Sequence, residues 1–154
     1  MLEILRTLAV HQGRFHQAFL ESWGLNPAVE LVDAALEALV YDGLWLTKFP
    51  LLWTPAYGLD RLDTLNKACL SPLTRPDAAE VAAQIAALRP RVDADTLRFV
   101  LKLTPEGLQT RVEIFFGGRA MNKPLWQYLL AWFEHDAVLR GRLRGPGLFD
   151  TAFS

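Results

Sequence analysis

A predicted helix from about residue 27 to residue 49 is apolar on two faces, and no other segment constrains the fold as strongly. One stripe at helical spacing contains Val32, Ala35, Leu36, Leu39, Val40, Gly43 and Leu44. A second stripe, rotated by roughly 100°, contains Leu31, Ala34, Ala38, Tyr41, Trp45 and Phe49. Because a surface helix has a single apolar stripe, a helix with two is buried on both sides. The sequence therefore predicts that other helices surround this one.

The segment before it separates two helices. Apolar residues at helical spacing, including Leu5 and Phe19, predict a first helix. This helix should end at Ser22-Trp23-Gly24-Leu25-Asn26-Pro27. Gly24 suits the left-handed position after a helix, Asn26 suits a helix cap, and Pro27 suits a first helical turn. We expect antiparallel helices on either side.

After an aromatic loop over residues 49–58, helical spacing returns in a third helix at about 59–73. Thr74-Arg75-Pro76-Asp77 resembles a capping box for a fourth helix that uses Val81, Ile85 and Leu88. At Arg89-Pro90-Arg91 the period changes, which predicts the end of that helix.

From Leu97 to Leu103 apolar and polar residues alternate, and they alternate again from Val112 to Phe116. With Thr104-Pro105-Glu106-Gly107 as a turn, this pattern predicts a β-hairpin. A last helix from about Lys123 to Leu143, capped by Asn122, would cover its apolar face, and an irregular tail would follow. The expected fold class is mainly α, with antiparallel helices and one β-hairpin covered by a helix in the C-terminal half. Residues 1–75 and 76–154 form its two regions.

The composition limits the classes of partner. The chain has 16 basic and 17 acidic residues and a formal charge of −1, so no electrostatic feature favours direct nucleic-acid binding. One cysteine fits a reducing compartment, and no apolar run approaches the roughly 20 residues of a membrane span. We expect a cytoplasmic protein without membrane attachment. The hydrophobic fraction of 51% indicates an apolar cavity or a subunit interface, and composition alone does not separate these.

Candidate catalytic and metal-binding groups are few. His11 and His16 are five residues apart, about 140° on a helix, which does not suit a shared metal ion, and His135 lies between carboxylates that point elsewhere. We therefore predict no catalytic residue, no metal and no cofactor. Gly117-Gly118-Arg119 suits an anion site between a strand and a helix, or a tight turn. Cys69 fits a buried structural thiol.

Aromatic residues at four-residue steps give the strongest remaining signal. They are Tyr41, Trp45 and Phe49, followed by Trp53 and Tyr57 in the next loop. The same residues suit a packed core or an apolar ligand cavity. Gly43 weakens its helix by about 1 kcal/mol relative to alanine, and its missing side chain would let another helix approach closely.

The run Val-Asp-Ala-Ala-Leu-Glu-Ala-Leu-Val-Tyr-Asp-Gly-Leu-Trp-Leu, residues 32–46, resembles the penultimate long helix of TetR-type transcriptional regulators. The connection from Phe15 to Pro27 and the helix at 59–73 are also similar to that family, over about residues 1–75. The resemblance implies transcription regulation through a helical domain that binds a small apolar effector and forms a homodimer. The family's pockets vary, so no ligand contact is carried over from it, and the candidate ligand-binding residues are those of the aromatic stripe and loop, Tyr41, Trp45, Phe49, Trp53 and Tyr57. The dimerisation residues would be Leu36, Leu39, Val40, Gly43, Leu62 and Leu65.

The helix-turn-helix domain of that family is absent, so the resemblance does not imply DNA binding by this chain. The leading hypothesis is a non-enzymatic effector-binding and dimerisation module. The alternative is a protein–protein interaction module, an accessory or adaptor protein that uses its apolar helix faces.

Overall fold

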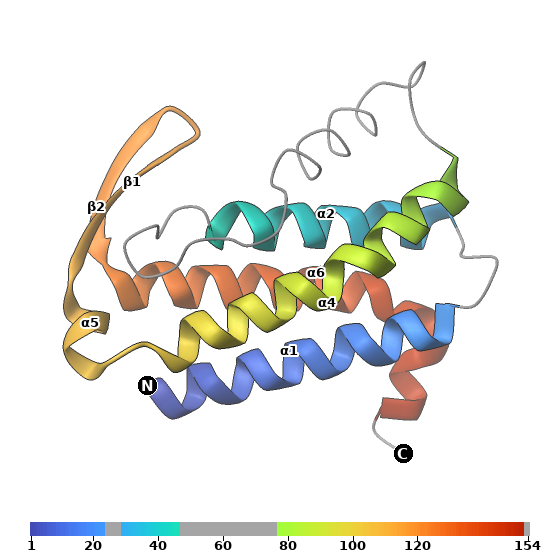
Figure 1. Cartoon of the computed structure of the whole chain (residues 1–154), viewed down its shortest axis with the longest axis horizontal. Helices are drawn as coiled ribbons and strands as arrows, with labels where there is room; N and C mark the ends of the chain where they lie inside the picture. Colours follow the sequence, from blue (N-terminus) through green and yellow to red (C-terminus); the bar gives the residue numbers. More distant parts are fainter. Residues whose placement is uncertain (24–28, 47–76, 153–154) are drawn as a thin grey trace.

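The computed structural model describes residues 1–23, 29–46 and 77–152, and within them four long helices lie side by side. These are α1 (Leu2–Trp23), α2 (Val29–Leu46), α4 (Ala78–Leu101) and α6 (Leu125–Ala152). In Figure 1, α1 and α6 run in one direction and α2 and α4 run in the other. The extensive contacts of α1 with α4 and of α2 with α6 are therefore between antiparallel helices. The mainly α class predicted from the sequence is confirmed.

Helix α2 is buried on both apolar stripes, as its sequence predicts. Leu39 and Val32 of one stripe and Ala38 and Trp45 of the other are all buried, while Leu44 is exposed. Contacts with α4 and α6 account for this burial. Helices from residues 1–75 and from residues 76–154 share one hydrophobic core.

Helix α4 continues through Pro90, so the predicted end of the helix at this position is wrong. Proline removes one helical hydrogen bond and costs about 3 kcal/mol. The burial of Val92, Phe99 and Val100 after it offsets that cost. Because Phe99 and Val100 are adjacent and both buried, the segment has helical rather than alternating burial. Asp77 caps the helix, with its side chain accepting the Ala79 N–H at 3.1 Å.

The hairpin lies later in the chain than predicted. Strand β1 (Arg111–Phe116) pairs antiparallel with β2 (Arg119–Pro124), and Ile114 faces Met121 in the register. The expected strand at 112–116 is confirmed, but its partner follows it, and residues 97–101 belong to α4. Gly117 and Gly118 have φ of 58° and 78°, the left-handed values that a two-residue hairpin turn needs. The predicted turn at Thr104 instead begins a short helix, α5 (Pro105–Gln109), where Thr104 accepts the Gly107 N–H at 3.0 Å.

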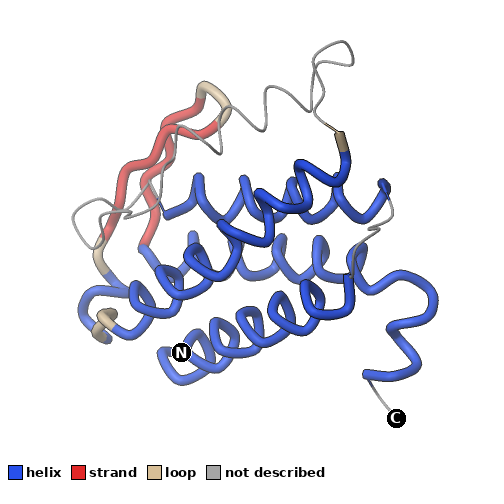
Figure 2. Tube along the Cα trace, turned by 45° about the vertical axis from the view of Figure 1, so that its right-hand side comes forward, coloured by secondary structure: helices blue, strands red, loops and turns tan. Residues whose placement is uncertain are grey.

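Helix α6 covers the hairpin at one end of the helices, which Figure 2 shows in red against blue. The buried Tyr128 hydroxyl accepts the Lys123 N–H at 3.1 Å and lies 2.8 Å and 2.9 Å from the carbonyl oxygens of Val112 and Met121. Asn122 lies in β2, so the prediction that it caps the last helix is wrong. The helix also extends past Leu143 to Ala152, where an irregular tail was expected.

Candidate functional site

Charged and polar side chains meet in the interior between the four long helices. The buried members are Gln12 and His16 of α1, Asp42 of α2, Arg89 of α4, and Trp132 and Asp136 of α6. Asp93 of α4 is at their edge. Buried charges are rare unless they are paired and hydrogen-bonded. We call these seven residues the buried polar cluster.

Asp42 is at the centre of this cluster. Its Oδ1 accepts the indole N–H of Trp132 at 2.8 Å. Its Oδ2 accepts Gln12 Nε2 at 2.9 Å and Arg89 Nη2 at 2.7 Å. One carboxylate on α2 is thus hydrogen-bonded to α1, α4 and α6.

Arg89 bridges two carboxylates. Its Nη2 lies 2.7 Å from both Asp42 Oδ2 and Asp93 Oδ1, and its Nε lies 2.9 Å from the same Asp93 oxygen. Burial lowers the pKa of Arg89, but Asp93, Asp42 and Asp136 raise it further, so the net shift is upward. Arg89 is therefore the permanent cation of the cluster.

His16 is neutral in this environment. Burial and the charge of Arg89 lower its pKa, and this outweighs the attraction of Asp93. Although burial raises the pKa of Asp93, Arg89 and the hydrogen bond from His16 bring it below its ordinary value. His16 Nδ1, 3.0 Å from Asp93 Oδ1, therefore donates its proton to an ionised carboxylate. The other ring nitrogen, Nε2, keeps its lone pair, is buried, and has no hydrogen-bond partner among the described residues.

Asp136 is the second carboxyl on the α6 side. Arg140 Nε lies 3.1 Å from its Oδ2 as an ion pair, and neither carboxyl oxygen accepts a hydrogen bond from a described donor. Burial and the neighbouring charge of Asp42 raise the pKa of Asp136 to about 8. Ligand atoms of His16, Asp42 and Asp136 lie within 4.8 Å of one another, so these three side chains could hold a metal ion.

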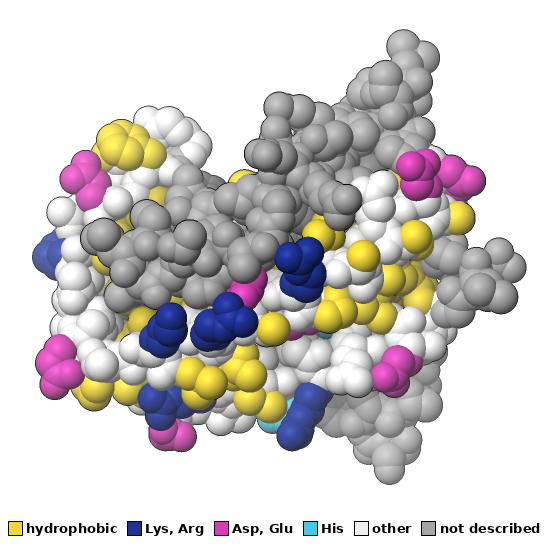
Figure 3. Space-filling model, in the orientation of Figure 1, with side chains coloured by type: hydrophobic (Ala, Val, Ile, Leu, Met, Phe, Trp, Pro, Cys, Tyr) yellow, Lys and Arg dark blue, Asp and Glu magenta, His cyan; other side chains and the backbone are white. Residues whose placement is uncertain are grey.

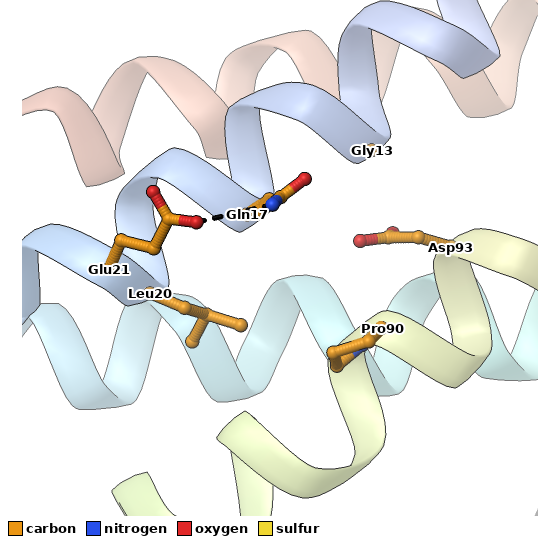
Figure 4. A pocket seen from close by; sticks show the side chains of 6 residues that line it. All are labelled: Gly13, Gln17, Leu20, Glu21, Pro90 and Asp93. Atoms are coloured by element: carbon orange, nitrogen blue, oxygen red, sulfur yellow. Dashed lines mark hydrogen bonds between the residues drawn. The ribbon is translucent and has the colours of Figure 1, made fainter.

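A groove of about 440 Å³ lies between α1 and α4, beside the buried polar cluster. It is lined by Gly13, Gln17, Leu20, Glu21, Pro90 and Asp93. In Figure 4 the Asp93 side chain points from α4 toward α1. On α1, Gln17 Nε2 donates a hydrogen bond to Glu21 Oε1 at 3.1 Å. The hydrogen bonds of Asp93 within the cluster all use Oδ1. None of these bonds uses Oδ2.

Figure 3 shows the surface over α4 and α1. Lys and Arg side chains lie along this face together with apolar patches and several acidic side chains. The groove between the two helices thus lies in a surface of mixed chemistry.

The predicted aromatic ligand residues lie against α6 where the structure describes them. Tyr41 stacks on His135 with ring centroids 4.0 Å apart, and Trp45 stacks on Trp132 at 6.2 Å. Trp45 is 6% exposed and belongs to the core. Phe49, Trp53 and Tyr57 lie outside the described residues, as do Cys69, Leu62 and Leu65. The structure thus brings two of the five predicted ligand residues together in packed rings.

The predicted dimer residues on α2 are inside the chain. Leu36, Leu39 and Val40 are buried core residues, and Gly43 is also buried. Their apolar stripe is therefore satisfied within one copy of the chain. A second copy would have to use other residues.

Two further candidates from the sequence are resolved by the fold. Gly117-Gly118-Arg119 lies between two strands rather than between a strand and a helix, so the tight-turn alternative holds and the expected helix N-terminus is absent there. His11 is exposed while His16 is buried, as their angular separation predicts.

Sequence reasoning missed the buried polar cluster. In the sequence, Asp42 lies within the run at residues 32–46, and Arg89 lies at the predicted end of a helix. The available signals were an aspartate inside a doubly apolar helix and an Arg89–Asp93 pair at i, i+4 spacing. The contacts themselves connect residues 30 to 90 positions apart, and no local pattern indicates them.

Comparisons with protein-family models, curated proteins and solved structures give no match to this chain. Within the described ranges, no helix has the length and apolar character required to cross a membrane. The fold and the buried polar cluster thus define the chain as a mainly α helical bundle with a charged interior.

Proposed function

We propose that the chain is a non-enzymatic binding module that holds a small ligand in the groove between α1 and α4. The observation that carries the proposal is that this groove reaches Asp93, the outer member of the buried polar cluster. Its volume of about 440 Å³ is within the usual range of small-molecule sites, roughly 300–1,000 Å³. This site replaces the predicted aromatic cavity, whose described residues are packed on α6.

The lining indicates the chemistry of the ligand. Gly13, Leu20 and Pro90 form apolar walls, while Asp93 and Glu21 supply negative charge. An apolar body with one cationic end, such as an aromatic amine or amidine, would satisfy both. Its cation would bind Asp93 Oδ2, and its body would lie along Leu20 and Pro90.

Such a ligand would act on the whole bundle through Asp93. Asp93 also binds His16 of α1 and Arg89 of α4, and Arg89 continues to Asp42 of α2. A ligand cation would share the Asp93 carboxylate with Arg89. A ligand that binds two arrangements of these helices unequally shifts the population between them, which is how an effector domain works.

The regulatory role and the homodimer are parts of the same proposal, and both rest on the resemblance of residues 1–75 to TetR-type regulators. Because the α2 stripe is in the core, the dimer would use another surface. An exposed face of α6 has Leu130, Ala131, Ala137 and Val138 at helical spacing around the exposed Glu134. A cytoplasmic location fits the single cysteine.

The groove is tested by NMR titration of the full chain with benzamidine, and with benzyl alcohol as its neutral counterpart. We expect benzamidine to shift the backbone amide of Gly13 and the side-chain amide of Gln17 more strongly than benzyl alcohol does. Gly13→Leu would fill the groove and abolish these shifts. Gly13→Ala is the matched control, because its Cβ would make an ordinary 3.8 Å contact with Asp93 Cβ.

Two outcomes contradict the proposal. One is a folded chain whose groove resonances do not move at millimolar benzamidine. The other is binding that Gly13→Leu leaves unchanged, because the ligand would then occupy a different site.

A further inference from the structure

Three potential metal ligands from three helices meet inside the bundle, and none of them lines the groove. They are His16 of α1, Asp42 of α2 and Asp136 of α6, all buried, with their ligand atoms within 4.8 Å of one another. The three positions are 26 and 94 residues apart in the chain, so the fold alone brings them together. An imidazole with two carboxylates is a donor set that Zn²⁺ and similar ions accept.

The orientation of His16 suits a metal ligand. Its Nδ1 lies 3.0 Å from Asp93 Oδ1, and a carboxylate that accepts this N–H holds the ring with the Nε2 lone pair on the opposite side. Histidine ligands of metals usually have such a carboxylate or carbonyl partner on the second nitrogen. Nε2 is buried and has no hydrogen-bond partner in the part of the chain that the structure describes. A buried acceptor without a partner costs roughly 1–3 kcal/mol. A cation bound to Nε2 would remove that cost.

The carboxylate side of the site also has unused acceptors. Neither oxygen of Asp136 accepts a hydrogen bond from a described residue, although its side chain is 0% exposed. Asp42 is positioned by Trp132, Gln12 and Arg89, so it is a rigid ligand supported from three helices. When all three carboxyls are ionised, they carry one charge more than the guanidinium groups of Arg89 and Arg140 balance. A bound cation would balance the ionised form of Asp136.

We propose that His16 Nε2, Asp42 and Asp136 bind one divalent first-row transition-metal ion, with Zn²⁺ as the best-matched probe. The nitrogen ligand favours such an ion over Mg²⁺ or Ca²⁺, which prefer oxygen ligands alone. Zinc–ligand distances of roughly 2.0–2.2 Å require the three side chains to move slightly inward. This site goes beyond the proposed groove. Asp93 lines the groove and positions His16, but none of the three metal ligands lines the groove.

Zinc binding is measured by calorimetry on the full chain after treatment with a chelator, with Mg²⁺ as the comparison ion. We expect one Zn²⁺ per chain, a rise in the thermal midpoint, and no comparable response to Mg²⁺. Asp136→Asn and His16→Asn should each weaken Zn²⁺ binding at least about tenfold. Asn at position 16 can still donate to Asp93, so this variant removes Nε2 while retaining the supporting hydrogen bond. His11→Asn is the matched control, an exposed histidine on the same helix, and should bind as the native chain does.

A measurement on the native chain covers the case in which a core variant does not fold. Zn²⁺ should shift the NMR resonance of His16 Nε2, while the resonances of His11 and His135 stay unchanged. The proposal is overturned if the folded chain binds no Zn²⁺, or if binding persists in both core variants. It is also overturned if Zn²⁺ shifts an exposed histidine and leaves His16 unaffected.

Discussion

At the scale of single residues, Arg89 holds the helices together by charge. Its guanidinium lies between Asp42 and Asp93 in the interior. Replacing a buried ion pair completely can be neutral, but removing one partner leaves the other charge buried and uncompensated. Arg89 is therefore the residue whose loss should affect stability most among the charged side chains described.

Arg89→Met should lower the free energy of unfolding by about 3–5 kcal/mol, because two carboxylates would lose their cation. Urea unfolding monitored by circular dichroism measures this change. Arg98→Met is the matched control, since Arg98 is 54% exposed in its pair with Asp95 and such pairs contribute about 0–1 kcal/mol. Equal losses in the two variants would contradict the role given to Arg89.

The stability of the metal-free chain should also depend on Asp136. Burial and Asp42 raise its folded-state pKa to about 8, whereas an aspartate in an unfolded chain has a pKa of about 3.9. Between these values the folded chain binds a proton that the unfolded chain has lost. The contribution of this group to stability is therefore fully present at low pH and is lost as the pH rises toward about 8.

Asp136→Asn tests this dependence, because the amide resembles the protonated carboxyl and does not titrate. Unfolding measured from about pH 4 to about pH 8 with a chelator present should show the variant gaining stability relative to the native chain as pH rises. A constant difference across this range would show that Asp136 is ionised in the folded state.

At the scale of helices and strands, the hairpin turn depends on two glycines with positive φ. Gly117→Ala should destabilise the chain by about 1–2 kcal/mol, the cost of a left-handed backbone with a Cβ. Gly141→Ala is the opposite control, because Gly141 is exposed within α6 and its Cβ would meet nothing within 4 Å. Alanine there should stabilise the helix by up to about 1 kcal/mol. Thermal unfolding of both variants measures these changes in stability. A less stable Gly141→Ala variant, or an unchanged Gly117→Ala variant, would contradict the prediction.

These elements show how far the sequence alone predicts the fold. The two apolar stripes of residues 27–49 predict the burial of α2, because helical periodicity is a local signal. Pro90 and the alternation after Leu97 predict a break and a strand, but burial of Phe99 and Val100 in a shared core overrides both local signals. Strand β2, with sequence Arg-Ala-Met-Asn-Lys-Pro, has few strand-forming residues and is determined by its pairing with β1.

The site was less predictable than the fold. His16 and Asp93 are 77 residues apart, and their spacing carries no information about contact. An isolated aspartate in an apolar helix indicates a buried partner, but only the packing of four helices identifies that partner as Arg89. The buried polar cluster is thus a property of the tertiary structure.

At the scale of the whole molecule, the proposed homodimer has a direct test. Sedimentation velocity should give the mass of two chains. Val138→Asp should give a single chain, because Val138 is 63% exposed on the face of α6 proposed for the dimer and an aspartate there would add to the charge of Glu134. Leu101→Asp is the matched control, since Leu101 is 55% exposed on α4, and it should remain dimeric. If the native chain sediments as a monomer at high concentration, the proposed homodimer is wrong.

The buried polar cluster and the proposed metal site both depend on the state of one buried ring, that of His16. If the four helices converge on an ionised cluster, His16 is neutral and carries its proton on Nδ1, against Asp93, with Nε2 unprotonated. Long-range ¹H–¹⁵N NMR of the metal-free chain at about pH 7 measures this tautomer directly, with the exposed His11 as an internal reference. We predict a protonated Nδ1 and an unprotonated Nε2 for His16. A proton on Nε2, alone or together with Nδ1, would contradict the geometry on which both the buried polar cluster and the metal site rest.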